Sequence, residues 1–239
     1  MSSLDAAWVY LSSSPLWHLT LTLLAFQFSA WLAARSGQHP LVNPVMISVL
    51  IIIAVLTVTS ADYPTYFDGA QFVHFLLGPA TVALAVPLYR QFVVVRRSLL
   101  AILVSIVCGS LTATVSAVGI GAWLGADIST LLSLAPKSVT TPVAMGITEQ
   151  LGGIPSLTAI LVIVTGILGA SLGPLVLSAA GVANPAARGL AIGTASHGIG
   201  TARAMQVSEV AGAFSGLAMG LNAIATAVML PLLWRLFFA

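Results

Sequence analysis

The sequence predicts an all-α integral membrane protein with seven to eight transmembrane or re-entrant helical segments, two of them broken in mid-membrane. Hydrophobic residues make up 59% of the 239-residue chain and charged residues only 6%, whereas roughly a quarter of the residues in a soluble domain are charged. The mean hydropathy is +1.07. Apolar stretches of about 17–25 residues, long enough to cross a bilayer as helices, recur along nearly the whole chain. We therefore expect one polytopic membrane domain over residues 1–239.

The composition and charge exclude several classes of protein. Cys108 is the only cysteine, so the chain cannot form an internal disulfide, a CxxC redox pair or a thiolate metal cage. The formal net charge is +2 and the charges stand mostly at segment ends, which is typical of topology signals rather than of a nucleic-acid footprint. We expect no metal, no cofactor and no nucleic-acid partner. The opening MSSLDAAWVYLSSSP lacks the basic region of a signal peptide and is expected to stay in the mature chain.

Enzymatic activity is not expected either. The sequence contains no GxSxG elbow, HExxH pair or Walker loop. Ser196 and His197 are adjacent in the chain, so their side chains are expected to diverge rather than to form a nucleophile and base pair. The sequence therefore favours a binding or transport role over catalysis.

The first half of the chain contains four predicted segments, at Leu16–Ala34, Val42–Thr59, Phe72–Tyr89 and Leu99–Leu124. Asn43 and Pro44 are suited to the N-cap and the first helical position of the second segment. The third segment contains Gly78, Pro79 and Pro87. Because an interior proline removes a backbone hydrogen bond, we expect this helix to be bent or broken, with Gly78 and Pro79 as hinge residues. Arginines after the first and third segments place those loops in the cytoplasm and the N-terminus outside.

The second half contains two interrupted segments between ordinary ones. The predicted elements are a short helix from the N-cap Asp127 to Ala135, a span over Ser156–Ala180, a helix that begins at Asn184 and Pro185, and a span over Gly212–Phe238. The first interruption follows the short helix and is flanked by two prolines, Pro136 and Pro142. The second lies in a glycine-rich run with hinge candidates Gly193, Gly198 and Gly200. Whether these segments cross the membrane or turn back stays open in the sequence.

Each interruption is predicted to end at the N-terminus of a half-helix. Pro142 disfavours helical backbone at Thr141, which is the expected N-cap, and residues 136–141 are expected to be extended. Thr201 follows the second interruption in the same way. The free N–H groups and the positive dipole end of such a half-helix attract anions. Unwound backbone is tolerated in a bilayer only where it is buried in protein or lines a wet cavity, so both interruptions are candidate binding regions.

Two cations accompany these interruptions. Lys137, the only lysine, lies in the first, and Arg203 follows the second. Placing a cationic side chain in mid-membrane costs about 2.5–3.5 kcal/mol of insertion free energy, which indicates a functional role. Cations with nearby hydroxyl groups are suited to bind a small hydroxylated or keto carboxylate. The candidate substrate-binding residues are Lys137, Ser138, Thr140, Thr141, Ser196, His197, Thr201 and Arg203. His197 and Glu149 are candidate proton carriers.

Each of these residues also has a purely structural interpretation. Lys137 could reach an interface beside a short turn, and Arg203 could be a loop arginine that follows the positive-inside rule. His197 could be a packed polar residue bonded to a carbonyl group. Glu149 could simply mark a helix end. Asn222 in the last segment is expected to form a hydrogen bond between helices.

The chain could also consist of two related halves, residues 16–124 and 128–238. Transporters are often built from two halves with broken helices at corresponding positions. Laying LLGPATVALAVPLYRQ on AIGTASHGIGTARAMQ pairs Gly78 with Gly193 and Gln91 with Gln206. Because the matches are few and the composition is biased, chance explains them about as well as common ancestry does, and both explanations stay open.

Four stretches, taken in order, resemble the LrgB/CidB family of bacterial membrane proteins. They are LLGPATVALAVPLY, PKSVTTPVAMGI, GGIPSLTAILVIVTGILGASLGP and ARGLAIGTASHGIGTARAM. They cover roughly residues 75–210, and as an ordered set they are highly specific. Gly198 stands where the family pattern has alanine, a small change that adds backbone freedom.

The resemblance implies a multi-pass protein of the bacterial inner membrane, usually encoded beside a smaller holin-like partner of the LrgA/CidA type. It implies two alternative functions. One is transport of small monocarboxylates such as glycolate, glycerate or pyruvate, as in the similar plastid glycolate/glycerate translocator. The other is a holin-like or antiholin-like pore or regulator that controls murein hydrolase activity and cell lysis. The paired cations favour the first, and a homo-oligomer is expected in both.

Overall fold

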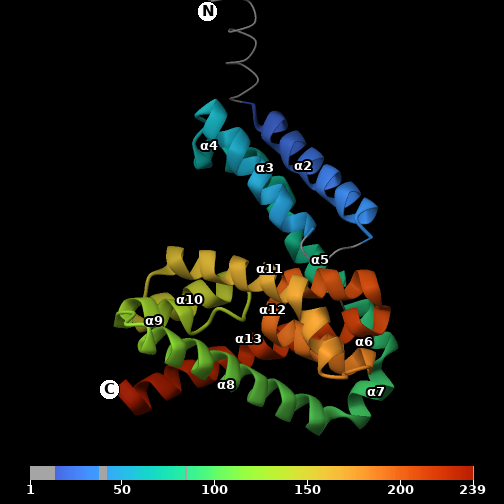
Figure 1. Cartoon of the computed structure of the whole chain (residues 1–239), viewed down its shortest axis with the longest axis vertical. Coiled ribbons are helices and arrows are strands. Elements are labelled where there is room, and N and C mark those ends of the chain that lie inside the picture. Colours follow the sequence, from blue (N-terminus) through green and yellow to red (C-terminus); the bar gives the residue numbers. More distant parts are fainter. Residues whose placement is uncertain (1–13, 38–41, 84, 239) are drawn as a thin grey trace, which may run out of the picture. The chain divides into compact units, whose positions relative to one another are not determined.

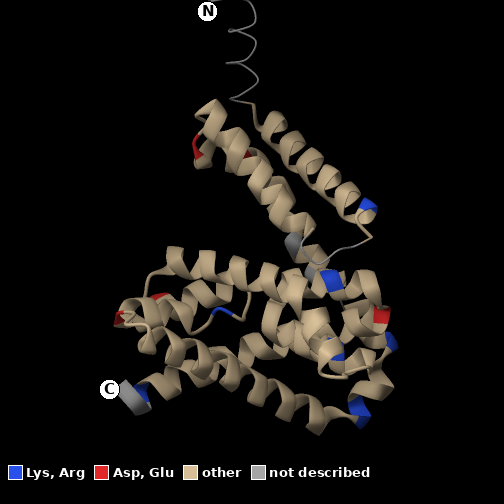
Figure 2. Ribbon diagram, viewed as in Figure 1, with Lys and Arg blue, Asp and Glu red and all other residues tan. Residues whose placement is uncertain are grey.

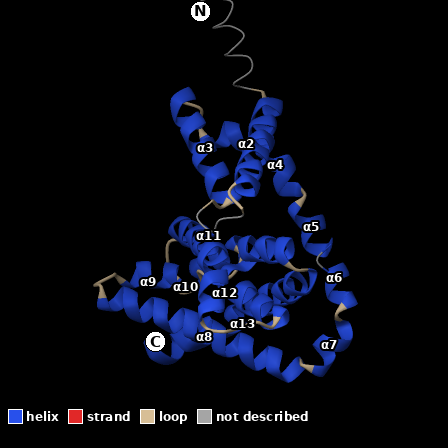
Figure 3. Cartoon of the chain, turned by 45° about the vertical axis from the view of Figure 1, so that its right-hand side comes forward, coloured by secondary structure: helices blue, strands red, loops and turns tan. Residues whose placement is uncertain are grey.

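The computed structural model describes residues 14–37, 42–83 and 85–238, and the described part of the chain contains helices and connections but no β-strand (Figures 1 and 3). The helices are α2 (Pro15–Arg35), α3 (Pro44–Thr59), α4 (Tyr63–Phe75), α5 (Leu77–Ala83), α6 (Ala85–Arg90), α7 (Phe92–Arg97), α8 (Leu99–Trp123), α9 (Ile128–Leu134), α10 (Thr141–Leu151), α11 (Pro155–Ala179), α12 (Pro185–Val207) and α13 (Glu209–Phe238). The predicted all-helical class is confirmed.

Five helical stretches in the described part of the chain are long and apolar enough to cross a membrane. They are α2, the stretch Tyr63–Arg90 that comprises α4 to α6, and the long helices α8, α11 and α13. Charged residues lie mainly near helix ends and connections, so the long helices are almost free of charge (Figure 2). The protein is therefore a multi-pass membrane protein. The expectation about the first residues of the chain falls on residues 1–13, outside the described part.

The predicted helix starts are confirmed where a polar side chain caps the helix. Asn43 accepts hydrogen bonds from the amides of residues 45 and 46, and Asn184 does the same for residues 186 and 187. Asp127 accepts from the amide of Thr130. Hydrogen bonds from Ser129 and Thr130 hold the pKa of the Asp127 carboxyl below its usual range. This cap therefore stabilises α9 at neutral pH and is lost as the pH falls through that lowered pKa.

The predicted third segment is interrupted, but its prolines do not lie in helix interiors. The break after α4 is at Leu76, and Pro79 and Pro87 lie in the first turns of α5 and α6. A proline in the first turn removes no helical hydrogen bond, because the amide there has no partner within the helix. The chain thus uses these prolines to begin short helices.

Clustering of contacts divides the chain into two compact units, Met1–Ala83 and Leu84–Ala239. In the N-terminal unit, α2 packs against both α3 and α4 (Figure 1). Gly69 of α4 allows the close approach, because a Cβ there would lie 2.8 Å from the Cβ of His18. The Thr22 and Tyr66 hydroxyls hydrogen-bond at 3.0 Å across the same contact. Small residues and hydroxyl pairs are the usual means of joining helices in lipid.

In the C-terminal unit, α12 packs against α8, α11 and α13 (Figure 1). The main apolar cluster lies between α8 and α13 and consists of Ile102, Ile106, Phe214 and Ala218. A Cβ on Gly193 of α12 would lie 2.8 Å from the Cα atom of Ser215, and one on Gly189 would collide with the backbone of Ala211. The first part of α12 therefore touches the backbone of α13 directly, as small-residue motifs allow.

Candidate functional site

The first interruption forms the tip of a helical hairpin. Helices α9 and α10 run antiparallel, because Ala135 shares a buried cluster with Ile147 while Val139 shares one with Ala144 nearer the tip. Residues 135–140 connect them. We call α9, this connection and α10 the first hairpin (residues 128–151), and residues 135–140 its tip.

The backbone of the tip forms tight turns. The prediction that residues 136–141 are extended is therefore wrong. The amides of Lys137 and Val139 bond to the carbonyl oxygens of Leu134 and Pro136, each at 3.2 Å. These turns supply partners that extended backbone would lack inside the protein. The N-cap of α10 is Thr140, with extended φ −64° and ψ 146°, one residue before the predicted cap. Helix ends commonly differ by one residue between criteria.

Lys137 stands at this tip, half-buried, between Pro136 and Ser138, which are both buried. Its ammonium group donates to Ser138 Oγ at 3.4 Å, and no carboxylate in the described part of the chain lies within ion-pair distance of it. Thr140, the N-cap of α10, follows three residues later. A cation without an anion and a positive helix end thus adjoin each other, an arrangement that favours anion binding.

The second interruption is the tip of another hairpin, within α12. His197 has φ 40° and ψ −133°, a backbone conformation that residues other than glycine rarely adopt. A Cβ on Gly200 would lie 2.8 Å from Ile192 Cγ2, and Ile192 belongs to one buried cluster with Ala204. Residues eight positions apart could not approach so closely in a straight helix, which rises about 1.5 Å per residue. We call α12 the second hairpin (residues 185–207), with His197 at its tip.

The turn is at His197, so the predicted hinge glycines have other positions. Gly193 and Gly200 lie in the two helical arms, and Gly198 follows the turn. A Cβ on Gly200 would press on Ile192 of the opposite arm, which explains the glycine there. The reversal also brings Ser196 and His197 against α11, at two different glycines.

His197 and Ser196 occupy two gaps on α11 that glycines create. A Cβ on Gly166 would lie 2.7 Å from the His197 ring, and one on Gly169 would collide with Ser196 Oγ. The His197 Nε2 atom lies 2.9 Å from the carbonyl oxygen of Val162 and, as its protonated nitrogen, donates to it. Ser196 Oγ is buried without a hydrogen-bond partner in the described part of the chain.

Thr201 holds the second tip closed. Its hydroxyl donates to the carbonyl oxygen of His197 at 2.8 Å and lies 2.9 Å from Ser215 Oγ of α13. The carbonyl group at the turn thereby has a hydrogen-bond partner. Thr201 is buried, and both hydrogen bonds of its hydroxyl are to protein atoms. Among the predicted site residues, it therefore stabilises the second tip.

The first tip and the second hairpin meet at Asn222 of α13. Its Nδ2 atom donates to the carbonyl oxygen of Ser138 at 3.2 Å and to that of Thr194 at 3.0 Å. The side chain is completely buried. One amide group therefore joins segments that lie far apart in the sequence, and it does so beside Lys137.

We call the contact at Asn222 the junction. The remaining predicted residues lie at various distances from it. Thr140 and Thr141 are half-buried at the start of α10. Arg203 is half-buried on the second arm of the second hairpin and donates to Gln206 Oε1 at 3.3 Å. Glu149 is exposed near the end of α10. Gly78 and Pro79 belong to α5, in the N-terminal unit.

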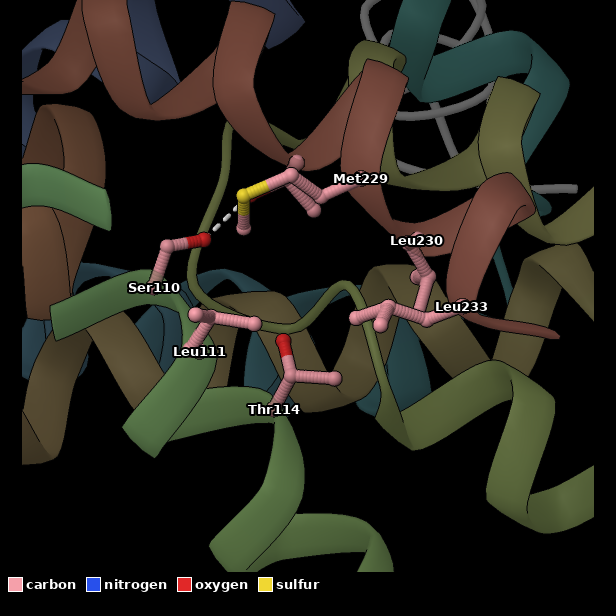
Figure 4. Close-up of a pocket in the computed structure, with 7 residues that line it drawn as sticks. Ser110, Leu111, Thr114, Met229, Leu230 and Leu233 are labelled. Atoms are coloured by element: carbon pink, nitrogen blue, oxygen red, sulfur yellow. Dashed lines mark hydrogen bonds between the residues drawn. The ribbon is translucent and has the colours of Figure 1, made fainter. Parts of the chain in front are cut away.

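A shallow surface depression, open to the outside, lies between α8 and α13 (Figure 4). Its wall includes Ser110 and Thr226, whose hydroxyls hydrogen-bond at 2.9 Å. Thr114 also lines it and donates to the carbonyl oxygen of Ala135, in the first tip. Thr226 is one turn along α13 from Asn222, so this depression approaches the junction from one side.

Sequence reasoning did not place Asn222, Thr194, Gly166 or Gly169 in the site. Asn222 was expected only to bond between helices, and that expectation is confirmed. A signal for a larger role was present, since Asn222 is the only amide side chain in the last segment and a polar group in such a segment is costly without a use. The glycines of α11 gave no such signal.

Comparison with known proteins establishes the family. The sequence profile of the LrgB-like family matches residues 22–236. The chain belongs to the LrgB-like family. This LrgB-like protein is 37% identical over 191 residues to the uncharacterized protein YwbG of Bacillus subtilis, covering 80% of this chain and 85% of the relative. It is 34% identical over 220 residues to the holin-like protein CidB of Staphylococcus epidermidis, covering 92% and 96%. It is 32% identical over 219 residues to the antiholin-like protein LrgB of Bacillus mycoides, covering 92% and 95%. No solved structure matches the chain.

Backbone strain at His197 gives a first testable prediction. Replacing His197 by glycine is expected to leave a more stable protein than replacing it by alanine, by about 1 kcal/mol, because only glycine adopts the backbone conformation of the tip without strain. In an ordinary helix the order is reversed, with alanine favoured by a similar amount. Thermal unfolding of the two variants in detergent measures the order. Gly146 of α10, where a Cβ meets nothing within 4 Å, provides the control, since Gly146→Ala is expected to stabilise. A more stable alanine variant at position 197 would show that the tip is helical.

Proposed function

We propose that this LrgB-like protein is a secondary transporter or facilitator of small monocarboxylates, with its binding site between the two hairpin tips. The observation that carries the proposal is the Asn222 amide, which bonds to the first tip at Ser138 and to the second hairpin at Thr194. It lies beside Lys137, which has no carboxylate partner among the described residues. Transporters commonly bind anions at the N-termini of discontinuous helices. Here α10 and the second arm of α12 begin at the two tips.

The lengths of the helices support a position in mid-membrane. His197 contacts α11 at Gly166, near the midpoint of Pro155–Ala179, and Asn222 lies near the midpoint of Glu209–Phe238. Helices of this length span the hydrocarbon core, so their midpoints lie near its centre. Two hairpins that enter the membrane and turn back would then place their tips at that depth. Irregular backbone is tolerated there only where protein or a wet cavity surrounds it.

Each residue of the proposed site would have a role that follows from its chemistry. Lys137 would bind the carboxylate as a point charge, and the amides at the start of α10 would bind it as helix-end donors. Arg203 would attract the anion from the second hairpin, while the hydroxyls of Thr140 and Thr141 would bind remaining oxygens. His197 is the candidate proton carrier, because it is buried at a tip. Glu149, which is exposed, would act only at the surface.

The names of the relatives favour a second candidate function, a holin-like pore or antiholin-like regulator of murein hydrolase activity and lysis. In that case the chain would act as an oligomer in the bacterial inner membrane with a small LrgA/CidA-type partner. A pore of this kind needs neither a binding site nor a selective cation.

Uptake into proteoliposomes distinguishes the two functions. For a transporter we expect uptake of labelled glycolate, glycerate or pyruvate that saturates with concentration, while a larger trapped dye stays inside the vesicles. Passage that rises linearly with concentration and is accompanied by dye leakage would reject the transporter and favour the pore. The measurement is repeated with a co-purified LrgA/CidA-type partner, because the partner could be required in either function.

A further inference from the structure

The two hairpins lie along opposite halves of α11. Near the start of α11, the Thr158 hydroxyl lies 2.9 Å from the hydroxyl of Thr148 in the first hairpin. Near its end, the carbonyl oxygen of Pro174 accepts a hydrogen bond from Arg188 of the second hairpin at 3.0 Å. The first hairpin thus approaches the middle of α11 from the start of this helix, and the second hairpin approaches it from the end.

The helix α13 has the same arrangement. In its first half, the backbone of Ser215 lies against Gly193 of the second hairpin. In its second half, Leu230 shares a buried cluster with Ala135 of the first hairpin, and Asn222 lies between these two contacts. Because α11 and α13 are both long and apolar enough to cross the membrane, their opposite ends lie at opposite faces of the bilayer. The two hairpins therefore start from opposite faces.

The arginines indicate which face is cytoplasmic. Arg96 and Arg97 directly precede α8, whose first turns pack on the first half of α13 (Figure 2). Arg90 forms an ion pair with the first residue of α13, and Arg188 stands in the first turn of the second hairpin. The opposite end of α13 carries Arg235. Since the cytoplasmic side of a membrane protein has the excess of basic residues, the second hairpin starts from the cytoplasm.

The sequence contains a repeat that matches this arrangement. Moving the chain by 60 positions lays the first hairpin and α11 on the second hairpin and α13. The identical pairs in and directly after the hairpins are Ala135 and Ala195, Thr141 and Thr201, Ala144 and Ala204, Met145 and Met205, Glu149 and Glu209, and Gly152 and Gly212. Repeats with opposite orientation in the membrane are common in transporters. This repeat differs from the halves 16–124 and 128–238 considered above.

The contacts of the tips follow the same relation. Lys137 and His197 occupy equivalent positions of the repeat, and so do Val162 of α11 and Asn222 of α13. His197 of the second repeat bonds to the carbonyl oxygen of Val162 in the first. Ser138, next to Lys137 in the first repeat, bonds to Asn222 in the second. Each tip therefore bonds to the same position on the long helix of the other repeat, a reciprocity that amino-acid composition does not explain.

We infer that the first hairpin enters the membrane from outside and the second from the cytoplasm, and that the two hairpins are the two gates of the site at the junction. The gating rests on the transport function proposed above, whereas the sides of entry do not. The first hairpin separates the junction from the outside, and the second separates it from the cytoplasm. Movement of one hairpin at a time would expose the site to one face only, as alternating access requires.

Labelling of single cysteines tests the sides of entry. Cys108, which is exposed, is first replaced by serine. Gln150→Cys, at the exposed end of the first hairpin, and Ala183→Cys, exposed just before the second, are then treated with a membrane-impermeant maleimide in spheroplasts and in inverted membrane vesicles. Gln150→Cys is expected to react only in spheroplasts, and Ala183→Cys only in inverted vesicles. Reaction of both from one side, or from the exchanged sides, would overturn the inference.

Disulfides that fasten each hairpin to α11 test the gates, again in the Cys108→Ser background. Thr148→Cys with Thr158→Cys fastens the first hairpin, since the two hydroxyls lie 2.9 Å apart. Gly173→Cys with Ile192→Cys fastens the second, since a Cβ on Gly173 would lie 3.8 Å from Ile192 Cγ1. Contacts this short allow a disulfide. Oxidation of either pair is expected to reduce saturable monocarboxylate uptake into proteoliposomes to background, and a reductant is expected to restore it.

The reduced double variants and the oxidised single-cysteine variants are the controls, and both are expected to keep uptake. Full uptake by either oxidised pair, with its disulfide verified by mass spectrometry, would overturn the gating. No saturable uptake by the unmodified protein would overturn the transport function and the gating with it. The labelling would still decide the sides of entry in that case, because it does not depend on uptake.

Discussion

Replacing Lys137 by alanine is expected to weaken monocarboxylate uptake by roughly 10- to 150-fold, because a hydrogen bond to a charged group contributes about 1.5–3 kcal/mol. Lys137 is the cation at the first tip, and its ammonium group donates only to Ser138 Oγ among the described residues. The alanine variant therefore loses no ion pair and is expected to unfold at the same temperature as the unmodified protein or higher, since a half-buried charge has been removed.

The combination of lost uptake and retained stability is what identifies a binding residue here. Uptake of labelled monocarboxylate and thermal unfolding in detergent measure the two quantities on the same preparation. Lys137→Arg is expected to restore part of the uptake, because it keeps the charge but changes the geometry of donation. Arg235→Ala, near the exposed end of α13, controls for removal of a cation elsewhere. Unchanged uptake in Lys137→Ala would remove the chemical basis of the proposed site.

Replacing Gly193 by alanine is expected to destabilise the protein by about 1–3 kcal/mol, the usual cost of forcing an extra group into a packed interior. A Cβ at this position would collide with the carbonyl oxygen of Ser215, and it would lie 2.8 Å from the carbonyl carbon and from Cα. Backbone atoms in a helix cannot rotate away as a side chain does. The first arm of the second hairpin must therefore move off α13, and Thr194, the next residue, would move with it.

Gly220→Ala is the matched control for this prediction, because Gly220 lies on the same helix as Ser215 and a Cβ there meets nothing within 4 Å. It is expected to be neutral or to stabilise the protein by up to about 1 kcal/mol, since alanine favours helical backbone over glycine. The yield of monodisperse protein and the unfolding temperature measure both variants. Equal unfolding temperatures for the two would contradict direct contact between the backbones of α12 and α13.

The helix starts show what a local sequence can determine. Asn43, Asp127 and Asn184 cap the helices that follow them, as predicted. A cap depends on a side chain and amides two or three residues away, so every atom of the interaction is contained in a short stretch. The same holds for Lys137, the only lysine, whose place between two prolines marks the first tip.

The second tip shows where local reasoning stops. Three glycines in one run predicted an interruption, yet the residue with non-helical backbone is His197. The reason lies on other helices: Gly166 leaves room for the imidazole ring, and the carbonyl oxygen of Val162 bonds to it. A glycine in a sequence permits both a turn and a close helix contact, and only the neighbouring helix decides between them.

By itself, the sequence determined that this protein is a helical membrane protein of the LrgB-like family, where most of its helices begin, and that a lone cation stands at an interruption. Composition, apolar length and capping are properties of single segments, and so they can be read along the chain. The tertiary structure alone decided that the interruptions are hairpin tips and that the first tip and the second hairpin meet at Asn222. Those bonds join residues 84 and 28 positions apart, and such contacts arise only when separate helices pack together.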